Sequence, residues 1–134
     1  EIRQVYFANG QIVWPGYQAV CTLLRDVQAQ QAVQMDLVLL DILCGVQGVL
    51  AGHGVHAPLH THSGFRTPQT NNALENASRS SQHLQGKAWD GGVPGVHTEF
   101  FSRAAIYLRG GGVGLYRSQQ FTHLDSGNLR FWRI

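Results

Sequence analysis

The chain has 134 residues, of which 43% are apolar and 13% charged, and it contains 16 glycines. This length and composition predict one loop-rich globular domain over residues 1–134 and exclude a disordered or fibrous protein. The formal net charge is only +2 and the basic residues are not clustered, which argues against a nucleic-acid-binding protein.

The first third of the chain predicts a hairpin followed by two helices. Asn9-Gly10 separates two apolar-rich runs, which predicts a two-stranded hairpin over residues 4–14, ended by Pro15-Gly16. Apolar residues at helical spacing predict a core helix over residues 17–27 and a buried helix over residues 36–50. The second run contains two aspartates and is shorter than the ~20 residues that a membrane span needs, so we expect no membrane-spanning helix.

The middle of the chain predicts a loop, a strand and a short helix. Glycines punctuate residues 48–57, which we expect to form a connecting loop, and residues 58–65 alternate enough to form a strand. Thr67-Pro68 then offers an N-cap followed by proline at the first helical position, which predicts a helix through Leu74. Arg66 therefore lies where a strand passes into a helix.

The last third predicts one helix and a small sheet. After a turn at residues 91–95, Thr98 is expected to cap a helix that Gly110–Gly112 stops. Three short strands follow, the last two joined by a tight turn at Ser126-Gly127; they span residues 112–116, 118–125 and 128–134. Helices first and a small antiparallel sheet with an inserted helix later predict the α+β class.

Neither the cysteines nor the amino terminus identifies a cellular compartment. Cys21 and Cys44 permit one disulfide, but both lie in apolar helical surroundings, so two buried free thiols fit as well. The chain begins at Glu1 and lacks a basic segment followed by an apolar one, so we expect any export signal to be absent from this chain.

His83 and Asp90 form the short-range pair of a candidate zinc site. Catalytic zinc typically takes three ligands from His, Asp and Glu and leaves a fourth position to water. Gly86 lets the chain turn back between the pair, and His123 is the candidate distant ligand. Because residues two apart on a strand share a face, Asp125 should point the same way as His123. The spacing alone is a weak pattern, since a single histidine in a small domain is more often hydrogen-bonded or exposed than a ligand.

The residues around this pair match a known signature. The pattern S-x-H-x-x-G-x-A-x-D, filled by Ser81, His83, Gly86, Ala88 and Asp90, resembles that of the zinc D-Ala-D-Ala peptidases and their hedgehog-type relatives. The segments HSGFRTPQTNNAL, GGVGLY and FTHLDSGNLRFW extend the resemblance to the murein endopeptidase branch, of the MepK (YcbK) type. The similarity covers nearly the whole chain, and it implies a hedgehog/DD-peptidase-like fold.

The resemblance also implies roles for single residues. It makes His83, Asp90 and His123 the Zn²⁺ ligands and places Arg66 beside the scissile carbonyl, where a guanidinium can stabilise an oxyanion or clamp a substrate carboxylate. The alternative for Arg66 is a salt bridge to a surface acid. Ser81 can hydrogen-bond Arg66 or the substrate, or it can be merely structural.

The chain departs from the family pattern at Gln120. Related dipeptidases and carboxypeptidases often carry Glu or Asp three residues before the last histidine ligand, as the base that activates water, and glutamine cannot accept a proton. Asp125 is then the candidate catalytic base. Equally, it can be a carboxylate that holds a ligand histidine in its metal-binding tautomer.

Other histidines and the tryptophans have weaker claims. A rival cluster comprises His53, His56, His60 and His62, of which the last two share a strand face and can bind metal. We expect this cluster to be secondary, with His60 or His62 bordering the site as a substrate contact, for which His62 is the choice, or, less favourably, as the missing base. Trp89 and Trp132 are expected in the core, and His97 is expected to act only locally at the start of a helix.

These observations predict a zinc metallopeptidase that hydrolyses peptidoglycan stem peptides or their cross-links in the periplasm or cell envelope. The alternative is a catalytically impaired, zinc-containing module that binds or scaffolds the cell wall, which Gln120 keeps open. A third possibility has no metal. The sequence leaves open which peptide bond is cut and which oligomer forms.

Overall fold

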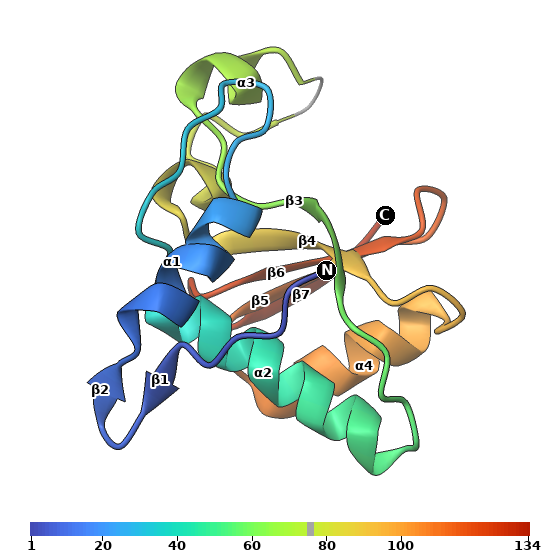
Figure 1. Cartoon of the computed structure of the whole chain (residues 1–134). Helices are drawn as coiled ribbons and strands as arrows, with labels where there is room; N and C mark the ends of the chain where they lie inside the picture. The colour runs from blue at the N-terminus through green and yellow to red at the C-terminus, as the bar shows by residue number, and fades with distance from the viewer. Residues whose placement is uncertain (75–76) are drawn as a thin grey trace.

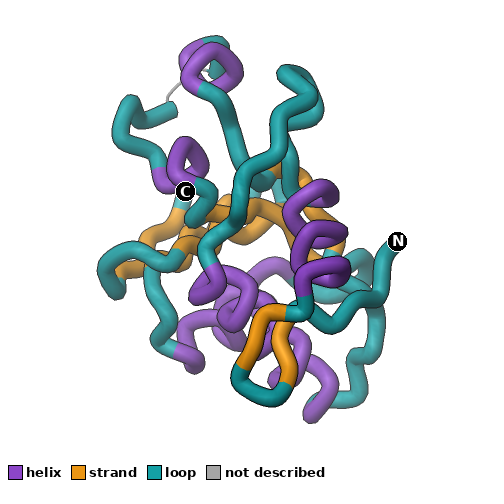
Figure 2. Tube along the Cα trace, turned by 60° about the vertical axis from the view of Figure 1, so that its left-hand side comes forward, coloured by secondary structure: helices purple, strands orange, loops and turns teal. Residues whose placement is uncertain are grey.

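The computed structural model describes residues 1–74 and 77–134. A five-stranded sheet carries two helices, α2 (Leu37–Gly52) and α4 (Thr98–Leu108), on one face, as Figure 1 shows. Figure 2 places the small amino-terminal hairpin and the short helix α3 (Pro68–Asn72) at opposite ends of the molecule. The α+β class expected from the sequence is confirmed.

The amino-terminal hairpin forms where the Asn-Gly dipeptide predicted it. Strands β1 (Phe7–Ala8) and β2 (Gln11–Ile12) pair antiparallel. Asn9 and Gly10 have φ angles of 54° and 76°, and positive values at both positions are what a two-residue turn of this hand requires.

The first helix differs from its predicted bounds. Helix α1 (Trp14–Leu23) begins earlier, because Pro15 lies in its first turn and has no N–H to satisfy there. It also ends earlier, because Asp26 bridges to Gln31 and closes a loop. Leu23 and Val27, which lie within the predicted core helix over residues 17–27, are therefore 45% and 60% exposed.

Helix α2 supplies much of the core and runs on to Gly52, past the start of the predicted loop. Its buried side chains are Leu39, Leu40, Ile42, Leu43, Val46 and Leu50. Cys44 is exposed and Cys21 is buried, and both are free thiols. None of the helices in the described part of the chain combines the length and apolar character that a bilayer crossing requires.

The sheet is mixed rather than wholly antiparallel. Its spatial order is β3 (His60–Ser63), β4 (Ala88–Gly92), β6 (Phe121–Asp125), β5 (Gly112–Tyr116) and β7 (Arg130–Arg133). The expected tight turn at Ser126-Gly127 does not make a hairpin. Because β4 and β5 already occupy both edges of β6, β7 passes to the outer edge of β5 and pairs with it in parallel.

Side chains cap the amino termini of helices α3 and α4. Thr67 caps α3 as predicted, with its Oγ1 accepting from the Thr70 N–H. The cap of α4 is His97 rather than Thr98, because its Nδ1 accepts from the Glu99 N–H at 3.2 Å.

The central strands divide the molecule into two sides. On β6, Thr122 and Leu124 face α4, and the hydroxyl of Thr122 lies 2.8 Å from that of Ser102 on that helix. Trp89 of β4 stacks on Phe101 of α4, which confirms its expected place in the core. The alternate residues Asp90, His123 and Asp125 point to the other side of the sheet, where their polar groups contact one another.

Candidate metal centre

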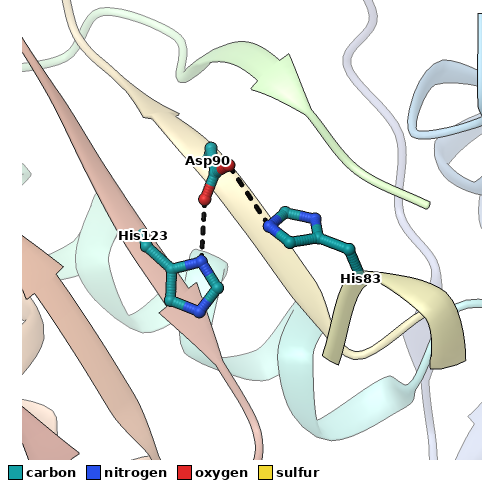
Figure 3. A group of neighbouring side chains, drawn as sticks. All are labelled: His83, Asp90 and His123. Atoms are coloured by element: carbon teal, nitrogen blue, oxygen red, sulfur yellow. Dashed lines mark hydrogen bonds and ion pairs between the residues drawn. The ribbon is translucent and has the colours of Figure 1, made fainter. Parts of the chain in front are cut away.

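Three side chains from separate parts of the chain meet on the side of the sheet opposite α2 and α4. His83 comes from the 3₁₀ helix η1 (Gln82–Gln85), Asp90 from β4 and His123 from β6. The register pairs Asp90 directly with His123, and Figure 3 shows both imidazoles directed at the Asp90 carboxylate. One donor atom from each lies within 4.8 Å of the others. The sequence placed these three residues together, and the tertiary structure does so.

The surroundings of His83 occupy its Nδ1 and leave its Nε2 without a hydrogen-bond partner. Ser81 caps η1, its Oγ accepting from the His83 N–H at 3.2 Å, and Gly86, at a φ of 67°, turns the chain back into β4. The His83 Nδ1 lies 2.7 Å from the Gly64 carbonyl, which can only accept, so Nδ1 carries the proton. The buried Nε2 then holds a lone pair and has no hydrogen-bond partner, although Asp90 Oδ2 is 3.2 Å away.

An orphaned nitrogen lone pair facing a carboxylate is costly unless a cation lies between the two groups. In the neutral imidazole, the neighbouring oxygen cannot satisfy Nε2 of His83, because both atoms are then acceptors. The donor set of two imidazole nitrogens and one carboxylate oxygen is one that zinc and similar transition metals accept. The residues present therefore fit a metal ion.

His123 lies between two carboxylates. Its Nδ1 is 2.8 Å from Asp90 Oδ1, and its Nε2 is 2.7 Å from Asp125 Oδ2. Burial by itself lowers the pKa of His123, but the hydrogen bonds to Asp125 and Asp90 outweigh it and raise the pKa. Burial likewise raises the pKa of Asp90, and its contacts with the two imidazoles outweigh that and lower it. The point between these side chains favours positive charge.

Arg66 lies beside the same carboxylate. It follows β3 and precedes α3, as predicted, and its Nη2 donates to Asp90 Oδ2 at 3.0 Å. Its Nε donates to Ser63 Oγ at 3.1 Å, and its backbone N–H donates to the His83 carbonyl. The side chain is only 15% exposed, so its partner is a buried acid of the site rather than the surface acid that was the alternative.

Asp125 is enclosed on every side. It is fully buried, and its Oδ1 accepts from the Gly112 and Gly127 N–H groups and from Arg130 Nη1. Its Oδ2 accepts from His123 Nε2 and Arg130 Nη2. Burial raises the pKa of Asp125, but His123 and Arg130 outweigh burial and lower it. Five donors and no exposed surface favour the orienting role, one of the two roles that the sequence left open, over proton transfer.

A cleft of about 990 Å³ opens over the site. Its walls include the predicted residues Arg66, Ser81 and His62, and the ring of His62 lies edge-on to that of Phe121. Gln120 is exposed, has a φ of 57° in the turn before β6 and borders a separate hollow. The position where relatives often carry the base therefore does not face this cleft.

The rival histidines do not form a second centre. Among the described residues, the one group with metal-binding geometry is that of residues 83, 90 and 123. His53 instead lies edge-on to Phe100 of α4, and His56 and His60 are exposed. Only His62 of this cluster lines the cleft.

Two cleft residues were missed or misplaced by the sequence reasoning. Trp132, expected in the core, borders the cleft, and its ring centroid is 5.4 Å from that of His123. Arg130, which the sequence did not single out, forms an ion pair with Asp125. The period-two spacing of Arg130 and Trp132 was a visible signal, but its meaning depends on where β7 joins the sheet.

Comparison with known proteins identifies the family. A family model described as peptidoglycan L,D-endopeptidase MepK matches residues 1–132. Peptidoglycan L,D-endopeptidase MepK of Escherichia coli (strain K12) is 37% identical over 112 residues, which are 81% of this chain and 60% of that protein. The probable peptidoglycan L,D-endopeptidase MepK of Haemophilus influenzae is 33% identical over 115 residues, which are 83% of this chain and 61% of that protein. No solved structure gives a significant match.

The alignments cover less than two thirds of each of these relatives. The match to the family model nevertheless spans the hairpin, the helices and the five-stranded sheet up to Trp132. It also includes all three side chains of the candidate centre. The chain belongs to the peptidoglycan L,D-endopeptidase MepK family, the branch that its motifs resemble.

Proposed function

We propose that this chain is a zinc-dependent peptidase that hydrolyses amide bonds in peptidoglycan stem peptides or their cross-links. The observation that carries the proposal is the buried, unpartnered Nε2 of His83, which converges with Asp90 and His123 on one point. The names of the relatives, peptidoglycan L,D-endopeptidases, support the substrate class. A substrate in the cell wall supports a location in the periplasm or cell envelope.

Zinc is the metal that the donor set suits best. Three protein ligands with a position left for water are typical of catalytic zinc, whereas calcium and magnesium prefer oxygen ligands. When bound, zinc would polarise the scissile carbonyl and lower the pKa of a water molecule toward ~7. His83 Nε2, His123 Nδ1 and an Asp90 oxygen would hold it, because the other ring nitrogens face Gly64 and Asp125.

The remaining residues position the ligands and the substrate. Arg66, held by Ser63 and Asp90 at the wall of the cleft, offers a fixed cation to the oxyanion that forms when the amide is attacked. Asp125 keeps His123 in one tautomer. Ser81 acts through η1, whose first turn it caps, and so through the backbone of His83.

The group that accepts the proton of the attacking water must be sought elsewhere, because the carboxylate of Asp125 is fully buried and already accepts five hydrogen bonds. Of the described cleft residues, His62 is the titratable side chain best suited to the task, since it is exposed and lies outside the ligand group. We therefore expect His62→Gln to lower kcat and to leave zinc affinity unchanged. Asp125→Asn should do the opposite, weakening zinc binding and regaining much of its activity at saturating zinc.

The proposal is tested by digesting defined cross-linked muropeptides, with and without a chelator, and identifying the fragments by mass. We expect cleavage of one bond type that stops with chelator and returns with added Zn²⁺. A cell-wall-binding module would instead retain purified sacculi and cleave nothing. Protein purified without chelator and containing far less than one equivalent of zinc would contradict the metal assignment.

A further inference from the structure

We infer that Arg130 is a positioning residue of the metal centre, acting through Asp125 on the imidazole of His123. The inference rests on the proposed function and extends it to β7, the edge strand of the sheet. β7 is not a neighbour of β6, yet its side chains reach the site across the intervening strand β5.

Arg130 forms a bidentate ion pair with Asp125 through two parallel hydrogen bonds. Nη1 donates to Oδ1 at 3.0 Å and Nη2 donates to Oδ2 at 2.8 Å. The same Oδ2 accepts from His123 Nε2 at 2.7 Å, so one oxygen joins the guanidinium to the imidazole. A shift of the carboxylate is therefore passed directly to the ring that offers Nδ1 to the metal.

The guanidinium performs two tasks that a point charge performs less well. Its planar fork fixes the plane of the carboxylate, and this plane sets the direction in which His123 is held. It also compensates the charge of a carboxylate that is fully buried, while its own side chain is 43% exposed. A lysine at this position would keep the charge and lose the second hydrogen bond.

Glycines in β5 make this reach possible. The parallel register pairs Gly112 with Arg130 and Gly114 with Trp132. A Cβ atom at Gly112 would overlap Arg130 Nη1 and lie 2.7 Å from both carboxylate oxygens of Asp125. A Cβ atom at Gly114 would lie 2.6 Å from the ring of Trp132. The side chains of Arg130 and Trp132 can therefore cross β5 only because positions 112 and 114 carry no side chain.

Trp132 completes the support. The guanidinium carbon of Arg130 lies 5.1 Å from the centroid of the Trp132 ring, within the range of a cation–π contact. The ring is anchored by a hydrogen bond of 3.2 Å from its Nε1 to the hydroxyl of Tyr116, and it also borders His123. The Arg130 guanidinium is thus fixed by Asp125 and faces the ring of Trp132, which lies beside the proposed metal ligand His123.

The test compares Arg130→Lys and Gly112→Ala with Arg133→Gln. Arg130→Lys removes one of the two hydrogen bonds to Asp125, and Gly112→Ala places a Cβ atom against Arg130 and the Asp125 carboxylate. Arg133, on the same strand, points to the opposite side and is the matched control. Zinc affinity is measured by competition with a chromogenic chelator. We expect Arg130→Lys and Gly112→Ala to bind zinc ~10-fold more weakly or worse, as supporting residues of metal sites do, and the control to stay within about two-fold of the wild type.

A second readout uses the metal-free protein. Long-range ¹H–¹⁵N spectra report which ring nitrogen of each histidine carries the proton, and circular dichroism checks the fold. We expect the His123 ring signals to shift in Arg130→Lys, because the carboxylate that accepts from its Nε2 is no longer held by two hydrogen bonds, with the His83 signals unchanged as an internal control. Unaltered zinc affinity and unaltered His123 signals in folded Arg130→Lys would overturn the inference. If the wild type bound no zinc, the proposed function would fail, and the spectra would still decide the role of Arg130.

Discussion

The two sides of strand β6 show two ways of burying side chains completely. Leu124 and Asp125 are neighbours in the chain, and neither has exposed surface. Leu124 points into the core that α2 and α4 complete, where it needs only apolar contacts. Asp125 points the other way and needs five hydrogen-bond donors. Burial on the apolar side therefore depends on how well side-chain volumes fill the core. Burial on the polar side depends on the positions of individual hydrogen-bond donors.

This difference explains why the polar side can act as a site. A buried apolar side chain tolerates any neighbour of suitable shape, whereas a buried carboxylate fixes the positions and protonation of its partners. His123 is therefore oriented before any ligand binds, and so is His83, through the Gly64 carbonyl. Changes on the polar side should affect metal binding, and changes on the apolar side should affect folding.

The largest effect is expected from Asp90→Asn on the polar side. The change removes the negative charge of the proposed ligand and places an amide between two imidazoles and Arg66. Structural zinc sites bind with ~10–16 kcal/mol in total, so the loss of one of three ligands should cost at least ~3 kcal/mol, about 100-fold or more in affinity. Competition with a chelator measures it, and a loss of less than 10-fold would argue against Asp90 as a ligand.

Leu124→Ala tests the apolar side of the same strand. A cavity at a fully buried leucine should lower the free energy of unfolding by ~3 kcal/mol, measured by urea denaturation of the metal-free protein. Zinc affinity of the folded variant should stay within a few-fold, because the backbone partners of β6 are unchanged. A large loss of zinc affinity here would show that the two sides are not independent.

Asp26 does not lie on β6, and it is a buried carboxylate outside the candidate metal centre. The pH dependence of its contribution to stability can be compared with the two sides of β6. Burial by itself raises the pKa of Asp26, but hydrogen bonds from the Ala29 and Thr67 N–H groups outweigh it and lower the pKa to about 2. Because the folded pKa is below the unfolded value of 3.8, its contribution is complete above pH 3.8 and is lost as the pH falls through about 2.

Asp26→Asn should therefore destabilise the protein at pH 7 by ~2 kcal/mol, the usual contribution of hydrogen bonds to a charged group. Urea midpoints of the two proteins should converge as the pH is lowered from 4 toward 2. A difference that persists at the acid end would mean that shape rather than charge makes the contribution of Asp26.

The smallest effect is expected for a buried pair of hydroxyl groups on the apolar side, those of Ser102 and Thr122. Thr122→Val leaves the Ser102 hydroxyl without its partner and should cost ~1 kcal/mol. The double variant with Ser102→Ala should cost less than the sum of the two single changes, since no unpaired group remains. Additive losses in such a cycle would show that the two hydroxyls are not coupled.

The sequence by itself determined the local elements and pointed to the three residues of the candidate metal centre. Asn9-Gly10 fixes the hairpin and Thr67-Pro68 the start of α3, because both depend on backbone preferences of neighbouring residues. The S-x-H-x-x-G-x-A-x-D motif identified the family and two of the three site residues, because Gly86 and the cap at Ser81 set their geometry within ten residues. The metal-binding and catalytic roles remain predictions.

Only the tertiary structure decided how the chain supports that triad. The position of β7 depends on which strand edges are already occupied, and a short run such as RFWR does not reveal this. The ion pair of Arg130 with Asp125, the place of Trp132 beside His123 and the enclosure of Asp125 all follow from that pairing. Local sequence sets backbone conformation and the side of a strand on which a residue lies, whereas the partners across a sheet are chosen by the competition of all strands for its edges.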